Sequence, residues 1–310
     1  MKKYKLTEKT IKHGSHTLYQ IEALRDFGDV KKGDLGGFIE KEDNLSQEGN
    51  AWVYGNARVY GNARVYGDAQ VFDNACLYDG AWVFDNAKVY GNAVIKNKAL
   101  VYGNSHIYGN ACVHNNTHVY GNAQVFGNAL IFNNSRVFEN ACVYDNACIF
   151  NNTEVHGNAS VYGNAKVRDY VRVYEDARVY DDACVYDDAR IYGNAQVYGN
   201  ARVYKDARVY GNAQVYGNAW VFRNARIFEN ARVYDDAWVY DYAQVYGNAQ
   251  ICNDTFVFGN AKVYGNLKLL GGLFFYTKEK FVEIDKVDID GNFELLARNP
   301  KFTYEKLKTS

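Results

Sequence analysis

Proline, methionine and long apolar runs are almost missing from this chain. It has one proline and one methionine in 310 residues. No stretch approaches the roughly 18 consecutive apolar residues that a membrane-spanning helix needs. The first ten residues, MKKYKLTEKT, lack the apolar core of a secretory signal. We therefore expect no membrane partner and a cytoplasmic location, in which the six cysteines are reduced.

An excess of either sign of charge is also missing. The chain has 35 lysines and arginines against 36 aspartates and glutamates, which gives a formal net charge of −1. Proteins that wrap nucleic acid need a positive field over much of their surface. The charge balance therefore disfavours a nucleic-acid partner.

What the chain does contain is a six-residue repeat. From Val53 to Val263 every sixth residue is Val, Ile or Leu, which makes 36 hexapeptides without an insertion. Each repeat reads aliphatic, aromatic, Gly/Asp/Asn, Asn/Asp, small, variable. Gly and Asn favour turns and positive φ, so short strands separated by turns are expected rather than helices.

Alternation along each short strand indicates which side chains face inward. In Ala57-Arg58-Val59-Tyr60 the small and the aliphatic residue fall on one side, and the arginine and tyrosine on the other. The Gly-Asn pair that follows turns a corner. Small and aliphatic residues inside, with a corner every six residues, predict a parallel β-solenoid.

The variable position predicts how many strands close one coil. Sampled every 18 residues, it separates into three columns of different chemistry. One is rich in arginine, a second begins with cysteine and ends in tryptophan, and the third is mostly glutamine, lysine and arginine. Three strands per coil, and about twelve regular coils at the usual strand spacing of roughly 4.8 Å, predict an all-β rod about 58 Å long.

The repeats resemble those of the hexapeptide-repeat, left-handed β-helix superfamily, whose pattern is aliphatic-x-x-x-small-x. Val53 and Ala57 match this pattern, as do their equivalents up to Val263. The resemblance, and not the pattern itself, implies a left-handed coil. Residues 23–57, which lead into the repeats, resemble a poorly characterised, YdcK-like group of bacterial and phage proteins that are labelled as transferases.

Both ends of a solenoid are open sheet edges that natural proteins cover. We therefore predict three segments. Residues 1–50 form an N-terminal cap, with a hairpin around Gly14 and a first irregular coil. Residues 51–268 form the β-helix, and residues 269–310 form a C-terminal β cap with a turn at Asp290-Gly291-Asn292.

The column that ends in tryptophan predicts a contact surface near the C-terminal end of the rod. Its six aromatic residues, called the aromatic surface below, are Trp220, Phe222, Trp238, Tyr240, Phe256 and Phe258. Leu130, Phe132 and Phe150 extend it toward the N-terminus, and Lys166, Arg168 and Arg202 interrupt it. The expected partner is another copy, as a dimer or a trimer, or another protein. The alternative is an aromatic ladder that covers itself.

The arginine column predicts either of two roles. Its members Arg172, Arg190, Arg208 and Arg226 follow one another at 18-residue intervals. They could form a structural network with corner aspartates and stack on neighbouring aromatic rings. The corner aspartates are Asp176, Asp182, Asp188, Asp206 and Asp236. Alternatively the column is a strip for a polyanion or an acidic partner.

An enzyme is the main competing hypothesis, because the resemblance implies an acyltransferase with a histidine base and a CoA or acyl-carrier donor. This chain lacks the loop that interrupts such coils. The weak catalytic candidates are His156 with Glu154 on the same face, and His118 two coils away. No three histidines converge within one chain, so no metal is expected. A cofactor, CoA, is expected only under the acyltransferase alternative. We expect a non-enzymatic scaffold rod, and weigh against it an acyltransferase and a phage effector that binds a host protein.

Overall fold

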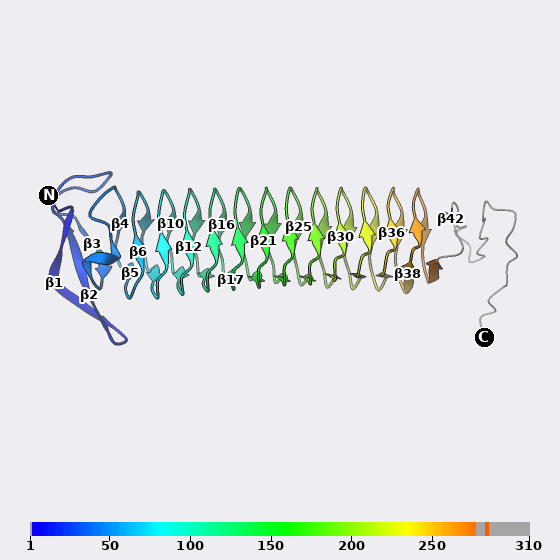
Figure 1. The fold of residues 1–310 in the computed structure, drawn as a ribbon, viewed down its shortest axis with the longest axis horizontal. Coiled ribbons are helices and arrows are strands. Elements are labelled where there is room, and N and C mark those ends of the chain that lie inside the picture. The colour runs from blue at the N-terminus through cyan, green and yellow to red at the C-terminus, as the bar shows by residue number, and fades with distance from the viewer. Residues whose placement is uncertain (1, 277–282, 285–310) are drawn as a thin grey trace, which may run out of the picture.

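The computed structural model describes residues 2–276 and 283–284. Within them the chain is a straight rod of stacked coils, with a hairpin projecting beside its N-terminal end (Figure 1). Each coil has three short strands, one in each of three parallel sheets, and the two 13-stranded sheets indicate about thirteen coils. The predicted parallel β-solenoid is confirmed. The predicted turn at Asp290-Gly291-Asn292 lies outside the described residues.

We call the three sheets A, B and C. Sheet A consists of β1 (Tyr4–His13), β2 (His16–Ala23), β3 (Leu35–Ile39), β5 (Arg58–Val59), β8 (Cys76–Leu77), β11 (Val94–Ile95), β14 (Cys112–Val113), β17 (Leu130–Phe132), β20 (Cys148–Phe150), β23 (Lys166–Arg168), β26 (Cys184–Tyr186), β29 (Arg202–Tyr204), β32 (Trp220–Phe222), β35 (Trp238–Val239), β38 (Thr255–Gly259) and β41 (Gly272–Tyr276). Sheet B consists of β4 (Trp52–Val53), β7 (Gln70–Val71), β10 (Lys88–Val89), β13 (His106–Ile107), β16 (Gln124–Val125), β19 (Cys142–Val143), β22 (Ser160–Val161), β25 (Arg178–Val179), β28 (Gln196–Val197), β31 (Gln214–Val215), β34 (Arg232–Val233), β37 (Gln250–Ile251) and β40 (Lys268–Leu269). Sheet C consists of β6 (Arg64–Val65), β9 (Trp82–Val83), β12 (Leu100–Val101), β15 (His118–Val119), β18 (Arg136–Val137), β21 (Glu154–Val155), β24 (Arg172–Val173), β27 (Arg190–Ile191), β30 (Arg208–Val209), β33 (Arg226–Ile227), β36 (Gln244–Val245), β39 (Lys262–Val263) and β42 (Glu283–Ile284). One 3₁₀ turn, η1 (Glu42–Asn44), precedes β4.

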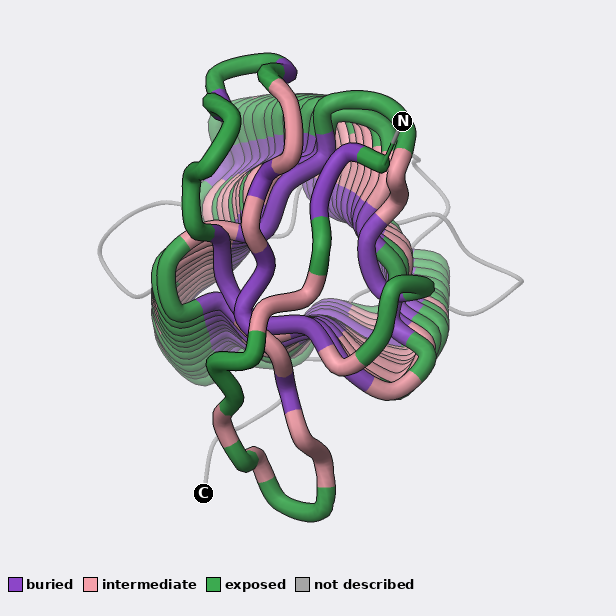
Figure 2. The backbone as a smooth tube through the Cα atoms, turned by 90° about the vertical axis from the view of Figure 1, so that its left-hand side faces the viewer, coloured by how far each residue is buried: buried purple, intermediate pink, exposed green. Residues whose placement is uncertain are grey.

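The core is a column of small and aliphatic side chains along the inside of the rod. Ala177 and Val179, in the middle of the rod, have no exposed surface. Viewed along the rod, buried residues line the three sides and exposed residues gather at the three corners (Figure 2). The inward assignment of the alanines and valines is therefore confirmed. Where threonine replaces alanine, as at Thr117, its hydroxyl donates a 2.7 Å hydrogen bond to the carbonyl of His114.

The corners explain the glycine, aspartate and asparagine of each repeat. The first corner residue adopts positive φ, for example 58° at Asp73 and 69° at Gly91 one coil later. The carboxylate of Asp73 accepts a 3.0 Å hydrogen bond from the backbone N–H of Gly91. An acidic residue in one coil thus satisfies a glycine N–H in the next coil.

At two of the three corners the second corner residue links neighbouring coils through its side chain, and at the third corner the first residue does so, as Asn97 donates to Asn115 at 2.9 Å. The amide of Asn92 donates to Asn110 at 3.1 Å, and Asn110 donates to Asn128 at 3.0 Å. Such ladders of side-chain amides run parallel to the rod axis, as they do in stacked in-register strands elsewhere.

The N-terminal hairpin predicted around Gly14 is confirmed, because β1 and β2 pair antiparallel with His13 opposite His16. Strand β3 then pairs parallel with β5, so the hairpin adds to the N-terminal edge of sheet A. The ring of Trp52 is buried between Tyr4 and Phe27, at centroid distances of 6.0 and 5.2 Å. These aromatic rings pack over the first regular coil.

The regular register ends where the sequence predicts, after Leu269. Sheet A neighbours are normally 18 residues apart, yet Phe256 lies opposite Leu273, 17 residues later. Strand β41 nevertheless continues sheet A with five paired residues. The division into a cap, a β-helix and a second cap remains a prediction.

Candidate functional site

The strand pairing confirms the 18-residue period of the outward residues. Arg172 lies opposite Arg190 in sheet C, and Trp220 lies opposite Trp238 in sheet A. Gln196 lies opposite Gln214 in sheet B. Each sheet therefore carries one of the three predicted columns on its outer surface, and the three faces of the rod differ in chemistry.

The aromatic residue that follows each aliphatic residue stacks on its equivalents in the adjacent coils. In sheet C the rings of Tyr174 and Tyr192 are 4.9 Å apart and within 3° of parallel. Tyr192 and Tyr210 are 4.8 Å apart and within 1°. Because each ring face is covered by the next ring, these ladders expose ring edges. They are consequently poor platforms for stacking sugars or bases, and their role in stabilising the sheets is favoured.

The aromatic surface on sheet A is two such ladders side by side. The indoles of Trp220 and Trp238 are stacked at 4.8 Å, and Phe222 stacks on Tyr240 at 4.9 Å. Phe222 also meets Trp238 edge to face, with ring centroids 6.0 Å apart. The two tryptophans are half-buried. Ring edges from both ladders thus form one apolar layer over β32, β35 and β38.

Arginine covers the N-terminal end of each ladder in this surface. The guanidinium of Arg202 lies 4.5 Å from the ring centroid of Trp220. The ladder of Phe222 continues through Tyr204 to Tyr186, where the guanidinium of Arg168 lies 4.6 Å from the ring centroid. Both contacts are cation–π interactions. Arg168 and Arg202 therefore end the ladders, rather than only interrupting an apolar patch. Phe132 and Phe150, with Leu130 beside them, form a separate stack at 4.9 Å farther toward the N-terminus.

The C-terminal end of the aromatic surface extends beyond its predicted limit. Leu273 pairs with Phe256, and Phe275 pairs with Phe258 in β41. Leu273 is 64% exposed and Phe275 is 53% exposed, more than the two tryptophans. These two residues were not predicted to belong to the surface, because they follow the break in the register. The apolar run LFFY over residues 273–276 is the signal that could have identified them.

The arginine column is only partly paired. Arg172 forms an ion pair with Glu154, with the guanidinium Nε 3.2 Å from the carboxylate. Within the described residues, Arg190, Arg208 and Arg226 form no ion pair. The predicted network with corner aspartates does not form around these three arginines. Several of those aspartates accept hydrogen bonds from asparagine ladders instead, as Asp176, Asp182 and Asp236 do.

The weak catalytic candidates are not assembled as a base and its orienting carboxylate. His156 lies in an aromatic ladder, with Phe138 at 4.6 Å on one side and Tyr174 at 5.2 Å on the other. Its Nδ1 is 3.6 Å from the carboxylate of Glu139 rather than that of Glu154. Glu154 instead lies between two arginines of its own column, Arg136 at 3.6 Å and Arg172 at 3.2 Å.

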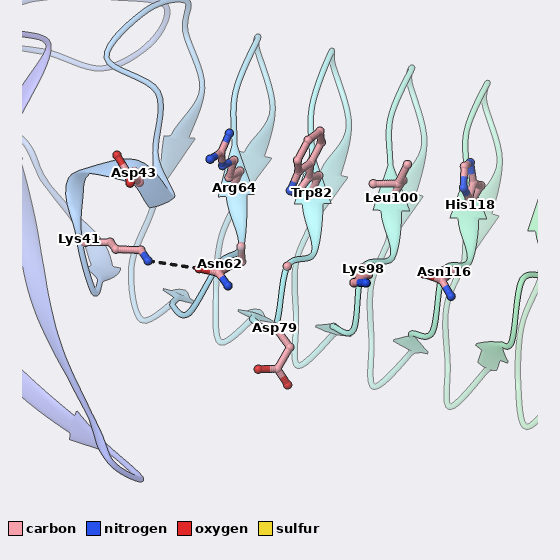
Figure 3. Close-up of a pocket in the computed structure, with 12 residues that line it drawn as sticks. Lys41, Asp43, Asn62, Arg64, Asp79, Trp82, Lys98, Leu100, Asn116 and His118 are labelled. Atoms are coloured by element: carbon pink, nitrogen blue, oxygen red, sulfur yellow. Dashed lines mark hydrogen bonds between the residues drawn. The ribbon is translucent and has the colours of Figure 1, made fainter.

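A groove near the N-terminal end contains the third candidate, His118. The groove has a volume of about 590 Å³ and lies beside η1, where successive coils each contribute residues from a corner and from the strand that follows it (Figure 3). The indole of Trp82 is 39% exposed, with the guanidinium of Arg64 5.6 Å from its ring centroid. Burial lowers the pKa of His118, and the positive charge of Arg136 lowers it further. The residues that line the groove are Lys41, Asp43, Asn62, Ala63, Arg64, Asp79, Gly80, Trp82, Lys98, Leu100, Asn116 and His118.

Both signs of charge line this groove, so it favours neither an anion nor a cation. Lys41 donates a 3.3 Å hydrogen bond to Asn62, and Asp43 and Asp79 are among the lining residues. Trp82 and His118 belong to one column, because Leu100 pairs with both, whereas Lys41 reaches the groove from the segment just before η1, which no repeat pattern predicts. Among the described residues, no group of three or more His, Cys, Asp or Glu side chains could hold a metal ion.

Comparison with known proteins identifies the type of repeat. A model of the YdcK β-solenoid repeat matches residues 51–67, 57–71, 183–199, 189–204, 195–211, 207–223 and 225–241. No curated protein matches the chain. None of the described residues forms a helix long and apolar enough to cross a membrane. The stacked hexapeptides show that the chain is a β-solenoid repeat protein, and over the matched residues its repeats are similar to the YdcK repeat.

Proposed function

We propose that this protein is a non-enzymatic scaffold rod, of bacterial or phage origin, that binds a second copy of itself through the aromatic surface. The observation that carries the proposal is the exposed C-terminal end of that surface. Leu273 and Phe275 extend two aromatic ladders and are 64% and 53% exposed. Large apolar groups gathered in this way on a soluble surface mark interaction sites.

The regular coils support a structural role rather than a catalytic one. From β4 to β39 the strands follow one another every six residues, and no loop leaves the coil between them. The stacked side chains and asparagine ladders hold each coil against the next. A rod of this kind presents side chains at fixed intervals, which suits it to binding an equally regular surface.

A second copy is the partner that fits the aromatic surface best. Both copies would present ladders with the same rise per coil, so ring edges of one could pack between ring edges of the other. The stacked rings leave their edges exposed, and Leu273 and Phe275 are 64% and 53% exposed, so this apolar surface is available to a second copy. Symmetric pairing of identical chains is also the commonest kind of assembly.

Light scattering on the purified protein tests the proposal. We expect the wild type to be a dimer or trimer, and Trp220→Glu/Trp238→Glu to be a monomer. Leu273→Glu/Phe275→Glu should have the same effect, because it removes the exposed end of the same surface. The matched control is Gln214→Glu/Gln250→Glu, which adds the same charge to sheet B and should remain oligomeric.

Circular dichroism separates loss of association from loss of folding, since each variant should keep the β spectrum of the wild type. A wild type that remains monomeric at high concentration would overturn the self-association. Calorimetric titration with CoA and acetyl-CoA tests the enzyme alternative. Saturable binding that disappears in His156→Ala would replace the scaffold with an acyltransferase.

A further inference from the structure

Four arginines stand in line on the outer surface of sheet C. Strands β24, β27, β30 and β33 are consecutive in the sheet, and the pairs Arg172–Arg190, Arg190–Arg208 and Arg208–Arg226 are in register. The aromatic ladder beside them gives the spacing per coil. Its ring centroids are 4.9 Å apart from Tyr174 to Tyr192 and 4.8 Å from Tyr192 to Tyr210.

Three of these guanidinium groups form no ion pair in the part of the chain that the structure describes. The carboxylate of Glu154 serves Arg172 and Arg136. Among the described residues, no carboxylate oxygen lies within 4.0 Å of a guanidinium nitrogen of Arg190, Arg208 or Arg226. The cation–π contacts of the described residues involve other cations. Positive charges held about one strand spacing apart repel one another, and bound anions relieve that repulsion.

The surroundings restrict the kind of anion that fits. The face is built from a straight run of paired strands, so a ligand must be extended along the rod. The faces of Tyr174, Tyr192 and Tyr210 are covered by one another, so bases of a nucleic acid have no ring to stack on. A flexible chain of closely spaced phosphate or sulfate groups can place anions between successive guanidinium groups.

We propose that the arginine column binds a linear polyanion of this chemistry along the rod axis, of which inorganic polyphosphate is the simplest example. Sulfated polysaccharides share the chemistry and are the second possible source. The site lies on a different face from the aromatic surface, so polyanion binding does not depend on self-association. Each polyanion would contact several coils at once.

Binding of labelled inorganic polyphosphate, measured by fluorescence anisotropy, tests this proposal. We expect the double variant Arg190→Gln/Arg208→Gln to bind about tenfold more weakly or worse, because two of four charge contacts are lost. Arg178→Gln/Arg232→Gln is the matched control. It removes the same charge from exposed arginines of sheet B that neighbour Ser160 and Gln196, or Gln214 and Gln250, rather than other arginines. It should bind within about twofold of the wild type, because the column is intact.

A third variant separates charge from structure. Arg190→Lys/Arg208→Lys keeps both charges and should retain most of the affinity, since lysine binds phosphate as a point charge. Wild-type affinity should also fall steeply with salt, with a log–log slope of roughly 3 for four neutralised charges. Heparin is the sulfated probe, and the tighter of the two ligands identifies the source.

Three results would overturn the proposal. One is a wild type that binds neither polyphosphate nor heparin at low salt. Another is an equal loss of affinity in the sheet B control, which would indicate binding through general charge alone. The last is tighter binding of a single-stranded dT oligonucleotide of the same charge, which would make the ligand a nucleic acid.

Discussion

The side-chain amide of Asn158 donates a 3.0 Å hydrogen bond to the carboxylate of Asp176 on the next coil. A carboxylate accepts hydrogen bonds but cannot pass one on, so the asparagine ladder ends at Asp176. The same coil ends the other two ladders, because Asn151 donates to Asp169 and Asn164 donates to Asp182. One coil near the middle of the rod therefore interrupts all three ladders.

Joining the ladder that ends at Asp176 to the next ladder at the same corner should stabilise the rod. In Asp176→Asn the new amide can donate to Asn194, which begins the next ladder at the same corner. We expect a gain of about 1 kcal/mol in the free energy of unfolding, the usual contribution of one added hydrogen bond. Urea unfolding measures it. Asp188→Asn is the control, since it removes the same charge at a corner position where Asn116 and Asn134 form no ladder bond. An equal gain in both variants would assign the effect to charge.

The core should tolerate neither charge nor extra volume at mid-rod. Val179→Asp places an unpaired carboxylate in the interior and should cost on the order of 4 kcal/mol. Ala177→Leu overpacks the corner and should cost about 1–3 kcal/mol. Both residues are fully buried. Arg178→Asp, on the same strand but facing outward, should change stability by less than about 0.5 kcal/mol. Native-like unfolding of the two core variants would mean that the inward assignment is wrong.

His114 should make stability depend on pH. Its ring stacks on Phe132 at 5.1 Å, and its Nδ1 is buried without a hydrogen-bond partner among the described residues. Burial lowers the pKa of His114 below its value in the unfolded chain, although a hydrogen bond with Asn115 raises the pKa in part. Between the two pKa values the unfolded chain binds more protons, so stability falls as the pH drops through about 6.5 and below.

His114→Phe removes this titration and extends the stack formed by Phe132 and Phe150. We expect the variant to gain more over the wild type near about pH 5 than near about pH 8. Urea unfolding at the two pH values measures the difference. Parallel pH profiles for the two proteins would show that the histidine does not carry the dependence.

Tyr180 should make the rod sensitive to alkali. Burial in the ladder between Tyr162 and Tyr198 raises the pKa of Tyr180 to about 12, and the neighbouring tyrosines add to the shift. The folded state therefore holds the neutral phenol. The stabilisation that comes from the raised pKa of Tyr180 is complete below the unfolded pKa of about 10 and is lost as the pH rises toward 12. Tyr180→Phe should lose less stability over this range in thermal melts. If Tyr180→Phe and the wild type lose the same stability between about pH 10 and 12, the titration of Tyr180 does not cause the loss.

The order of residues within each column could be predicted from the sequence, whereas the ion pairs of the charged side chains could not. The column order follows from the 18-residue period, so the alignment of Trp220 with Trp238 was predictable. The partners of charged side chains were not, because several carboxylates compete for each cation within one coil. Glu154 pairs with arginines of its own column, whereas His156 lies nearer Glu139 at the adjacent corner. The separation of two neighbouring coils is about one strand spacing, so such choices are decided by rotamers and not by spacing in the sequence.

The sequence by itself determined the solenoid, its six-residue register and the inward position of residues such as Val179. A strict repeat makes each strand face the same neighbours, so local alternation and corner residues settle the fold. The left-handed sense remains a prediction from the resemblance. Only the tertiary structure decided that Leu273 and Phe275 rejoin the aromatic ladders after a one-residue slip, and that Arg190 and Arg208 form no ion pair among the described residues. Pairing across a register break and competition among charges depend on distances between coils, which a one-dimensional repeat does not specify.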